Sequence, residues 1–379
     1  MPKNPSYNSP GRANQTPLSG RSSSQPSQPS RPSRPSRPSA GQSSAQPSRP
    51  SAGQSSAQPS GPPWGPTPGR PRAVAALGVF DGVHRGHQAL LDRVLAGAGR
   101  DGAASAVVTF DPPPAKVFAR EPLGAIEITP APEKTEILRA CGIEHVRILP
   151  FTLEFARLSA ETFVREVLLA EFDLVGAVVG HDFSFGAGRQ GDPSTLTAFG
   201  RELGFWVEVV PAVTLEGARI SSSRIRDLLR EGDVRSAAAL MGRELAFRGR
   251  VVRGEGRGVR EFVPTANLSI SPDQLLPAPG VYRVWAEPPG GGRLPGVASV
   301  GPVPTLGTGH DRLVEVHILN VDIDLRDQAL RVGFVEWLRP VKTFPNAGAL
   351  REAILADVEE ARKRFANEGY KPLATDTSL

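Results

Sequence analysis

The sequence predicts a doubly wound α/β domain followed by a small antiparallel β-barrel, with a disordered tail in front of both. Three observations support this prediction. Strand and helix patterns alternate from about residue 73, and β-rich segments separated by Gly and Pro replace them near residue 245. The first 72 residues contain almost no large apolar side chains. We therefore expect a tail over 1–72, an α/β domain over 73–243 and a barrel domain over 244–370.

The tail is rich in Pro, Ser, Gln, Gly and Arg and contains a tandem repeat, SAGQSSAQPSRP at 39–50 and SAGQSSAQPSGP at 51–62. Such a segment buries too little apolar surface to offset the entropy of ordering it. It holds nine Lys or Arg residues and no Asp or Glu, whereas the rest of the chain has a net charge of −4. We therefore expect no specific nucleic-acid binding by the folded part, while weak contact of the tail with RNA or acidic surfaces stays open.

The composition of the whole chain narrows the class of protein to which it can belong. The chain holds one cysteine, Cys141, which excludes an intramolecular disulfide and is typical of a reducing compartment. No apolar run reaches the roughly 20 residues of a membrane-spanning helix, and the N-terminus lacks the apolar core of a secretory signal. We expect a soluble, cytoplasmic protein without a membrane partner; the sequence leaves its oligomeric state open.

The α/β domain is expected from apolar runs that alternate with segments of helical spacing. The run AVAALGVF at 73–80 is apolar throughout, as a buried parallel strand is, and residues 88–96 then show helical spacing of Leu and Val. The same criteria predict strands at 104–110, 145–151, 174–180 and 205–213, and helices at 133–141, 163–172 and 196–204. Ligands of such a sheet bind at the carboxyl ends of its strands.

The barrel domain is expected from short β-rich segments between Gly and Pro clusters. These segments lie at 247–254, 280–287, 294–301, 313–320 and 329–338. A helix over about 347–365 follows them and is expected to close the barrel.

The strongest local motif is G-V-F-D-G-V-H-R-G-H at 78–87, between a predicted strand and a predicted helix. His84 and His87 are three residues apart, so at a helix start they project to one side. Gly86 permits close approach of a polyphosphate, and the helix start offers unpaired N–H groups. Positioning and electrostatics of this kind suffice for adenylyl transfer without a covalent intermediate. The motif therefore predicts an ATP-dependent nucleotidyltransferase.

A second motif, I-S-S-S-R-I-R at 220–226, stands before the helical run at 225–232. Serines at a helix start are common caps, which gives this motif a purely structural interpretation. At the same end of the same sheet as the histidines, its arginines gain a second interpretation. Arg226 and Arg224 could hold the β- and γ-phosphates as pyrophosphate leaves.

Residues 73–365 resemble the bacterial bifunctional riboflavin kinases/FMN adenylyltransferases, also called prokaryotic FAD synthetases. The matching stretches are collinear and together specific to that family. They are GVFDGVHRGHQALL (78–91), TFDPPP (109–114), GHDFSFGAGRQGD (180–192), ISSSRIR (220–226), GRVVRG (249–254), PTANL (264–268) and LVEVHILN (313–320).

The resemblance implies a Rossmann-like FMN adenylyltransferase domain followed by a riboflavin kinase domain, with riboflavin, FMN and ATP as substrates and Mg²⁺ as cofactor. In the first domain His84 and His87 would be catalytic, and Asp182, Phe183 and Phe185 would shape the flavin pocket. The implied ATP-binding residues of that domain are Gly78, Phe80, Gly86, Ser222, Ser223, Arg224 and Arg226.

In the implied kinase domain, Thr265 and Asn267 would hold Mg²⁺, and Thr265 would also contact ATP. Their hydroxyl and amide oxygens suit a hard cation. Glu315 would be the general base that accepts the proton of the ribityl 5′-hydroxyl.

The sequence departs from the family pattern mildly in the first domain and more strongly in the second. The mild departures are Pro113, His181 and Ser223; the strong ones are Val259, Phe262, Val303 and Val341. Three hypotheses therefore stay open. They are the bifunctional enzyme, which we favour, a nucleotidyltransferase for another substrate with a weakened or inactive kinase domain, and a non-catalytic flavin-binding or regulatory protein.

Overall fold

The computed structural model describes residues 69–120, 124–252, 265–302, 312–319, 321 and 323–368. Most of the predicted tail lies outside the described residues, and so do Val259, Phe262 and Val303. The α/β and barrel regions both fall within one compact unit of the chain, 59–379.

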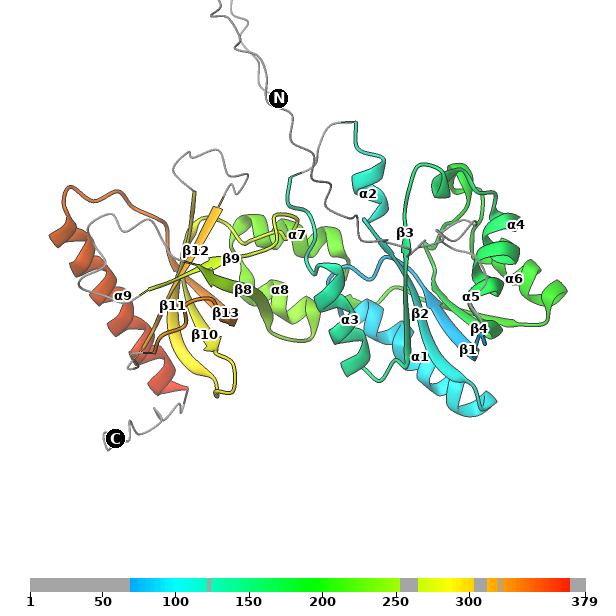
Figure 1. Cartoon of the computed structure of the whole chain (residues 1–379), viewed down its shortest axis with the longest axis horizontal. Coiled ribbons are helices and arrows are strands. Elements are labelled where there is room, and N and C mark those ends of the chain that lie inside the picture. The colour runs from blue at the N-terminus through cyan, green and yellow to red at the C-terminus, as the bar shows by residue number, and fades with distance from the viewer. Residues whose placement is uncertain are drawn as a thin grey trace, which may run out of the picture. The chain divides into compact units, whose positions relative to one another are not determined.

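The first region contains the expected parallel sheet (Figure 1). Its strands are β1 (Arg72–Leu77), β2 (Ala104–Asp111), β3 (His145–Pro150), β4 (Asp173–Gly180) and β5 (Trp206–Val210). They pair in the order β3-β2-β1-β4-β5, and every pair is parallel. Because the order reverses between β1 and β4, the carboxyl ends of these two strands flank the expected ligand crevice.

Helices cover both faces of this sheet. Ala73, Ala75 and Leu77 of β1 belong to one hydrophobic cluster, whereas Val74 and Ala76 belong to another on the opposite face. The second cluster includes residues of α1 (Arg85–Asp101) and α3 (Ala131–Ala140). The first includes residues of a helix built from α4 (Ala160–Thr162), η2 (Phe163–Leu168) and α5 (Leu169–Glu171), and of α6 (Pro193–Leu203).

Several short elements of this region were not predicted. They are α2 (Pro114–Val117), η1 (Phe155–Arg157), η3 (Ala187–Arg189), the hairpin of β6 (Thr214–Leu215) and β7 (Ala218–Arg219), and α8 (Val234–Met241). The helix after the serine motif is α7 (Ser222–Glu231), which begins three residues earlier than the helical run indicated. The η2 segment is π-helical, a wider turn that apolar spacing alone does not reveal.

The second region is a closed antiparallel barrel (Figure 1, yellow-green to orange). Its described strands are β8 (Leu245–Val252), β9 (Ala266–Ser269), β10 (Gly280–Glu287), β11 (Leu294–Pro302), β12 (Arg312–Ile318) and β13 (Ala329–Arg339). The order β10-β11-β12-β9-β8-β13 returns to β10 through its pairing with β13. The predicted fold class is confirmed, although the four-residue strand β9 was missed as a strand.

The C-terminal helix α9 (Ala347–Asn367) packs on the barrel through apolar and charged contacts. Arg283 of β10 is fully buried, and its guanidinium pairs with Glu336 of β13 and with Glu368 just after the helix. The same guanidinium lies 4.6 Å from the ring centroid of Phe365. A buried arginine with two carboxylate partners and an aromatic neighbour fixes the helix against the barrel.

Candidate active sites

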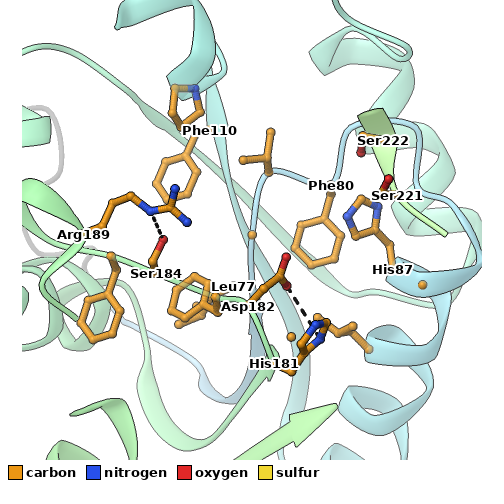
Figure 2. A pocket seen from close by; sticks show the side chains of 18 of the residues that line it. Leu77, Phe80, His87, Phe110, His181, Asp182, Ser184, Arg189, Ser221 and Ser222 are labelled. Carbon is orange, nitrogen blue, oxygen red and sulfur yellow. Dashed lines mark hydrogen bonds and ion pairs between the residues drawn. The ribbon is translucent and has the colours of Figure 1, made fainter. Parts of the chain in front are cut away.

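A cavity of about 970 Å³ opens where β1 and β4 end. Its lining includes Gly78 to Phe80, which directly follow β1, and Gly180 to Asp182, which begin at the last residue of β4. Figure 2 shows His87, Ser221 and Ser222 at one end of the cavity and Phe110, Ser184 and Arg189 at the other. The cavity therefore occupies the switch point of the sheet and has two chemically different ends.

The loop between β1 and α1 is strained. Phe80 and Val83 have φ angles of 53° and 37°, which side-chain-bearing residues rarely adopt, and Gly82 has a φ of 84°. Both Phe80 and Val83 are fully buried, so packing helps to hold this conformation. The loop turns the chain sharply from the strand into the helix that carries His87.

Side chains from other elements hold the carbonyl groups of this loop. Thr109 Oγ1 donates to Val79 O at 2.8 Å, and the buried Lys134 Nζ donates to the same oxygen at 3.2 Å. Arg243 Nη2 donates to Gly82 O at 2.7 Å. Because these carbonyls are held by donors from other elements, the position of the loop depends on distant parts of the chain.

His84 and His87 form one unit at the start of α1. His84 is the N-cap of the helix, and its Nδ1 accepts from the backbone N–H of His87 at 3.3 Å. The two rings stack with their centroids 3.7 Å apart and their planes 13° from parallel. A Cβ at Gly86 would lie 3.1 Å from the His84 ring, so this glycine makes room for the histidine itself.

Both histidines are neutral at neutral pH in this cavity. Burial lowers the pKa of His84 to about 4, and the guanidinium groups of Arg219, Arg226 and Arg243 act in the same direction. Burial also holds the pKa of His87 well below its ordinary value, with further contributions from His84 and Lys134. The pair therefore offers N–H donors to an anion, and the charge of a bound anion would raise both pKa values.

The serine motif places its serines and its arginines differently. Ser221 caps α7 by accepting from Arg224 N at 3.2 Å, and Ser221, Ser222 and Ser223 all line the cavity. Neither Arg224 nor Arg226 is among the described residues that line the cavity. Arg226 instead donates to Asp81 Oδ2 at 2.7 Å.

Arg219, which the sequence analysis did not single out, lines the cavity and pairs with Asp182. Burial raises the pKa of Asp182, but the hydrogen bond and charge of Arg219 outweigh it and hold that pKa below its ordinary value. The tight turn of the β6–β7 hairpin, with positive φ at Glu216 and Gly217, brings Arg219 to the cavity. The Glu-Gly pair at that turn is the signal that could have indicated this hairpin.

The other end of the cavity is aromatic. Phe183 and Phe185 stack with their ring centroids 5.4 Å apart, and Arg189 donates to Ser184 Oγ at 2.8 Å beside them. Phe118, directly after α2, is 61% exposed although it lies at the cavity, so a planar ligand could cover it. The phenylalanines that line the cavity are Phe80, Phe110, Phe118, Phe151, Phe155, Phe163, Phe183 and Phe185.

In the barrel, Asn267 of β9 and Glu315 of β12 are direct cross-strand partners. Their neighbours Leu268, Val314 and Val316 are buried in the barrel core, so both polar side chains lie on the opposite face of the sheet. Asn267 is nevertheless only 4% exposed. Two of the predicted kinase residues, far apart in sequence, thus lie side by side.

Two other positions of the barrel region that the sequence pointed out are Thr265 and Val341. Thr265 stands directly before β9 and is partly exposed. Val341, one of the departures from the family pattern, is 43% exposed beyond the end of β13. Among the described residues, none of the helices has the length and hydropathy required to cross a bilayer.

The FAD synthetase family matches residues 68–224, and the riboflavin kinase family matches residues 241–365. The bifunctional riboflavin kinase/FMN adenylyltransferase of Escherichia coli (strain K12) is 35% identical over 292 residues, covering 77% of this chain and 92% of the relative. The protein of the same description from Pseudomonas fluorescens is 36% identical over 304 residues, covering 79% and 94%.

A solved structure described as a macrolide-efflux protein from Streptococcus pneumoniae is also similar. It is 31% identical, superimposes with a TM-score of 0.70, and the similarity covers 79% of this chain and 95% of that one. The efflux role in that description applies to the Streptococcus pneumoniae protein. For this chain the comparison shows similarity of fold and sequence. The two sequence relatives and the two family matches show that this chain belongs to the bifunctional riboflavin kinase/FMN adenylyltransferase family.

Proposed function

We propose that this protein phosphorylates riboflavin to FMN and adenylylates FMN to FAD, using ATP in both steps. We assign adenylyl transfer to residues 73–243 and phosphoryl transfer to 244–370. The observation that carries the proposal is a single cavity with a stacked histidine pair and a helix start at one end and a wall of phenylalanines at the other. A nucleotide that joins a polyphosphate to a planar flavin fits these two ends.

In adenylyl transfer, a phosphate oxygen of FMN attacks the α-phosphorus of ATP, and the bond to the departing pyrophosphate breaks. His84 can donate from Nε2, because its Nδ1 already accepts a hydrogen bond. With His87 and the start of α1 it would stabilise the charge that builds on the α-phosphate and on pyrophosphate. Ser222 and Ser223 line the same end and would add hydroxyl donors.

Arg219 is our proposed cationic partner of the departing phosphates. It is the arginine of this segment that lines the cavity, and its partner Asp182 can release it when a stronger anion enters. The loop at Gly78, Phe80 and Gly86 would lie against the nucleotide. Of the two arginines predicted to bind ATP, we retain Arg224 as a peripheral contact and assign Arg226, which binds Asp81, no direct contact with ATP.

The flavin ring would occupy the aromatic end of the cavity. Phe183 and Phe185 offer two stacked rings there, against which one face of the flavin could pack. The exposed ring of Phe118 could contact another part of the same planar group. Asp182 lies between the two ends and would contact the flavin or its ribityl chain.

For phosphoryl transfer, we propose that Glu315 accepts the proton of the ribityl 5′-hydroxyl as the hydroxyl oxygen attacks the γ-phosphorus of ATP. The bond from the γ-phosphorus to the β,γ-bridging oxygen breaks, and ADP departs. Thr265 and Asn267 would hold Mg²⁺, which supplies charge neutralisation at the phosphates when bound. A buried amide beside a carboxylate on the neighbouring strand fits an oxygen-preferring cation, and this placement supports the assignment.

The direct test is incubation of the full chain with ATP and Mg²⁺ and either riboflavin or FMN, followed by chromatography of the flavins. We expect FMN and FAD from riboflavin, and FAD from FMN. FAD from FMN without any FMN from riboflavin would favour an adenylyltransferase with an inactive barrel. No product from either flavin would overturn the proposal. The single cysteine agrees with cytoplasmic FAD synthesis, which we propose as its setting.

A further inference from the structure

Asp81, in the middle of the strained loop, has hydrogen bonds on both carboxylate oxygens although it is only 4% exposed. Its Oδ1 accepts from the backbone N–H groups of Ile128 at 2.9 Å and Thr129 at 3.0 Å. Its own carbonyl oxygen accepts from Ser222 Oγ at 2.8 Å. This residue therefore links the loop to the segment before α3 and to the first turn of α7.

The second carboxylate oxygen of Asp81 binds Arg226. Arg226 Nη2 donates to Asp81 Oδ2 at 2.7 Å, and its Nε donates to Ile126 O at 2.8 Å. The side chains of the pair are 5% and 21% exposed for Asp81 and Arg226. The guanidinium is thus directed into the protein framework behind the loop, and neither residue belongs to the described lining of the cavity.

We propose that Asp81 and Arg226 are a positioning pair for adenylyl transfer, which hold His84 and Ser222 in register at the phosphate end of the cavity. The inference rests on the proposed function of that cavity. Asp81 lies three residues before His84 in a loop whose conformation is unfavourable in isolation. Charge-assisted hydrogen bonds from the Asp81 carboxylate to the segment before α3 and to α7 therefore replace the local preference that the loop lacks.

The substitutions Asp81→Asn and Arg226→Met separate this role from direct phosphate binding. Asparagine keeps an oxygen for Ile128 and Thr129 but turns an amide N–H₂ toward the guanidinium. We expect either substitution to lower kcat for FAD formation from FMN about 10- to 100-fold, because small misplacements of reacting groups cost this much. The KM for ATP should stay within about threefold, and the double variant should be no slower than the slower single variant.

Asp233→Asn is the matched control. Asp233 caps α8 by accepting from Ser236 N at 2.9 Å, and asparagine is an equally good cap. This control should keep wild-type FAD formation. Far-UV circular dichroism and the melting temperature of the same preparations report whether each variant is folded.

A readout independent of turnover is the pair of imidazole signals in a ¹H–¹⁵N spectrum. We expect Asp81→Asn to shift the signals of His84 and His87, because their stacked rings shield each other only in register, and Asp233→Asn to leave them unchanged. Unchanged histidine signals in Asp81→Asn would overturn the inference even if the wild type made no FAD. A KM for ATP that is raised tenfold or more in Arg226→Met, with kcat unchanged, would also overturn the inference, because it would show that Arg226 binds ATP directly. If Asp81→Asn fails to fold, the kcat and KM of Arg226→Met decide.

Discussion

The two candidate active sites are held in place in different ways. In the α/β region His84 lies on a loop whose carbonyl groups are bound by side chains as distant as Thr109 and Arg243. In the barrel Asn267 and Glu315 lie on neighbouring strands, where the backbone ladder fixes their spacing. The geometry of a site on loops depends on side chains from other elements that hold the loop. The geometry of a site on paired strands depends on the register in which the strands pair. Substitutions should therefore affect the two activities separately.

The largest effect is expected from His87→Ala. Loss of one donor at a developing charge typically lowers kcat by about 100- to 1000-fold. FAD formation from FMN should fall by at least about 100-fold, while riboflavin phosphorylation continues at the wild-type rate. Chromatography of the flavins measures both reactions in one sample. Near-normal FAD formation would show that the histidine pair does not serve adenylyl transfer.

Glu315→Gln is the reciprocal experiment. Glutamine keeps the size and polarity of the side chain but cannot accept the hydroxyl proton, and loss of a general base costs about 100- to 10,000-fold in rate. FMN formation should fall accordingly, while FAD formation from added FMN stays unchanged. Equal rates in wild type and variant would remove Glu315 from the kinase mechanism and leave the α/β site unaffected.

The buried histidines make the stability of the α/β region depend on pH. The pKa of His84 is about 4 in the fold, against an ordinary value of 6.5, so between these values the unfolded chain binds the proton more readily. The free energy of unfolding should therefore decrease by about 2 kcal/mol for this residue between pH 7.5 and pH 5.

The matched variant is His84→Asn, which keeps a good N-cap for α1 but does not titrate. Urea unfolding at the two pH values should show a smaller decrease for the variant than for the wild type. The same decrease in both proteins would show that His84 is accessible to protons in the folded state.

The smallest effects are expected from shortening the N-terminus. Removal of residues 1–68 should change neither activity nor melting temperature, because that segment has almost no apolar side chains to bury. Removal of 1–72 would also delete Arg70, which donates to Leu169 O, and Arg72, the first residue of β1. We expect that deletion to cost about 1 to 3 kcal/mol, measured as a lower melting temperature. A large loss of stability on removal of 1–68 alone would contradict the sequence-based expectation.

Local sequence patterns determined much of this protein. Alternation of apolar runs and helical spacing predicted the sheet strands near their observed bounds, because each run has to bury its own side chains whatever surrounds it. The strand β9 escaped that criterion, since four residues are too few to show a period. The motif at 78–87 likewise indicated one end of the cavity, because its spacing sets which side chains project together at a helix start.

Tertiary structure alone decided which of the neighbouring arginines lines the cavity. Arg219 and Arg226 stand seven positions apart in one motif region, yet the first lines the cavity and the second turns toward Asp81. Likewise, the pairing of Asn267 with Glu315 arises from the order of strands in the barrel. The direction of a long side chain and the partner of a strand depend on residues far away in the chain, and no local pattern records them.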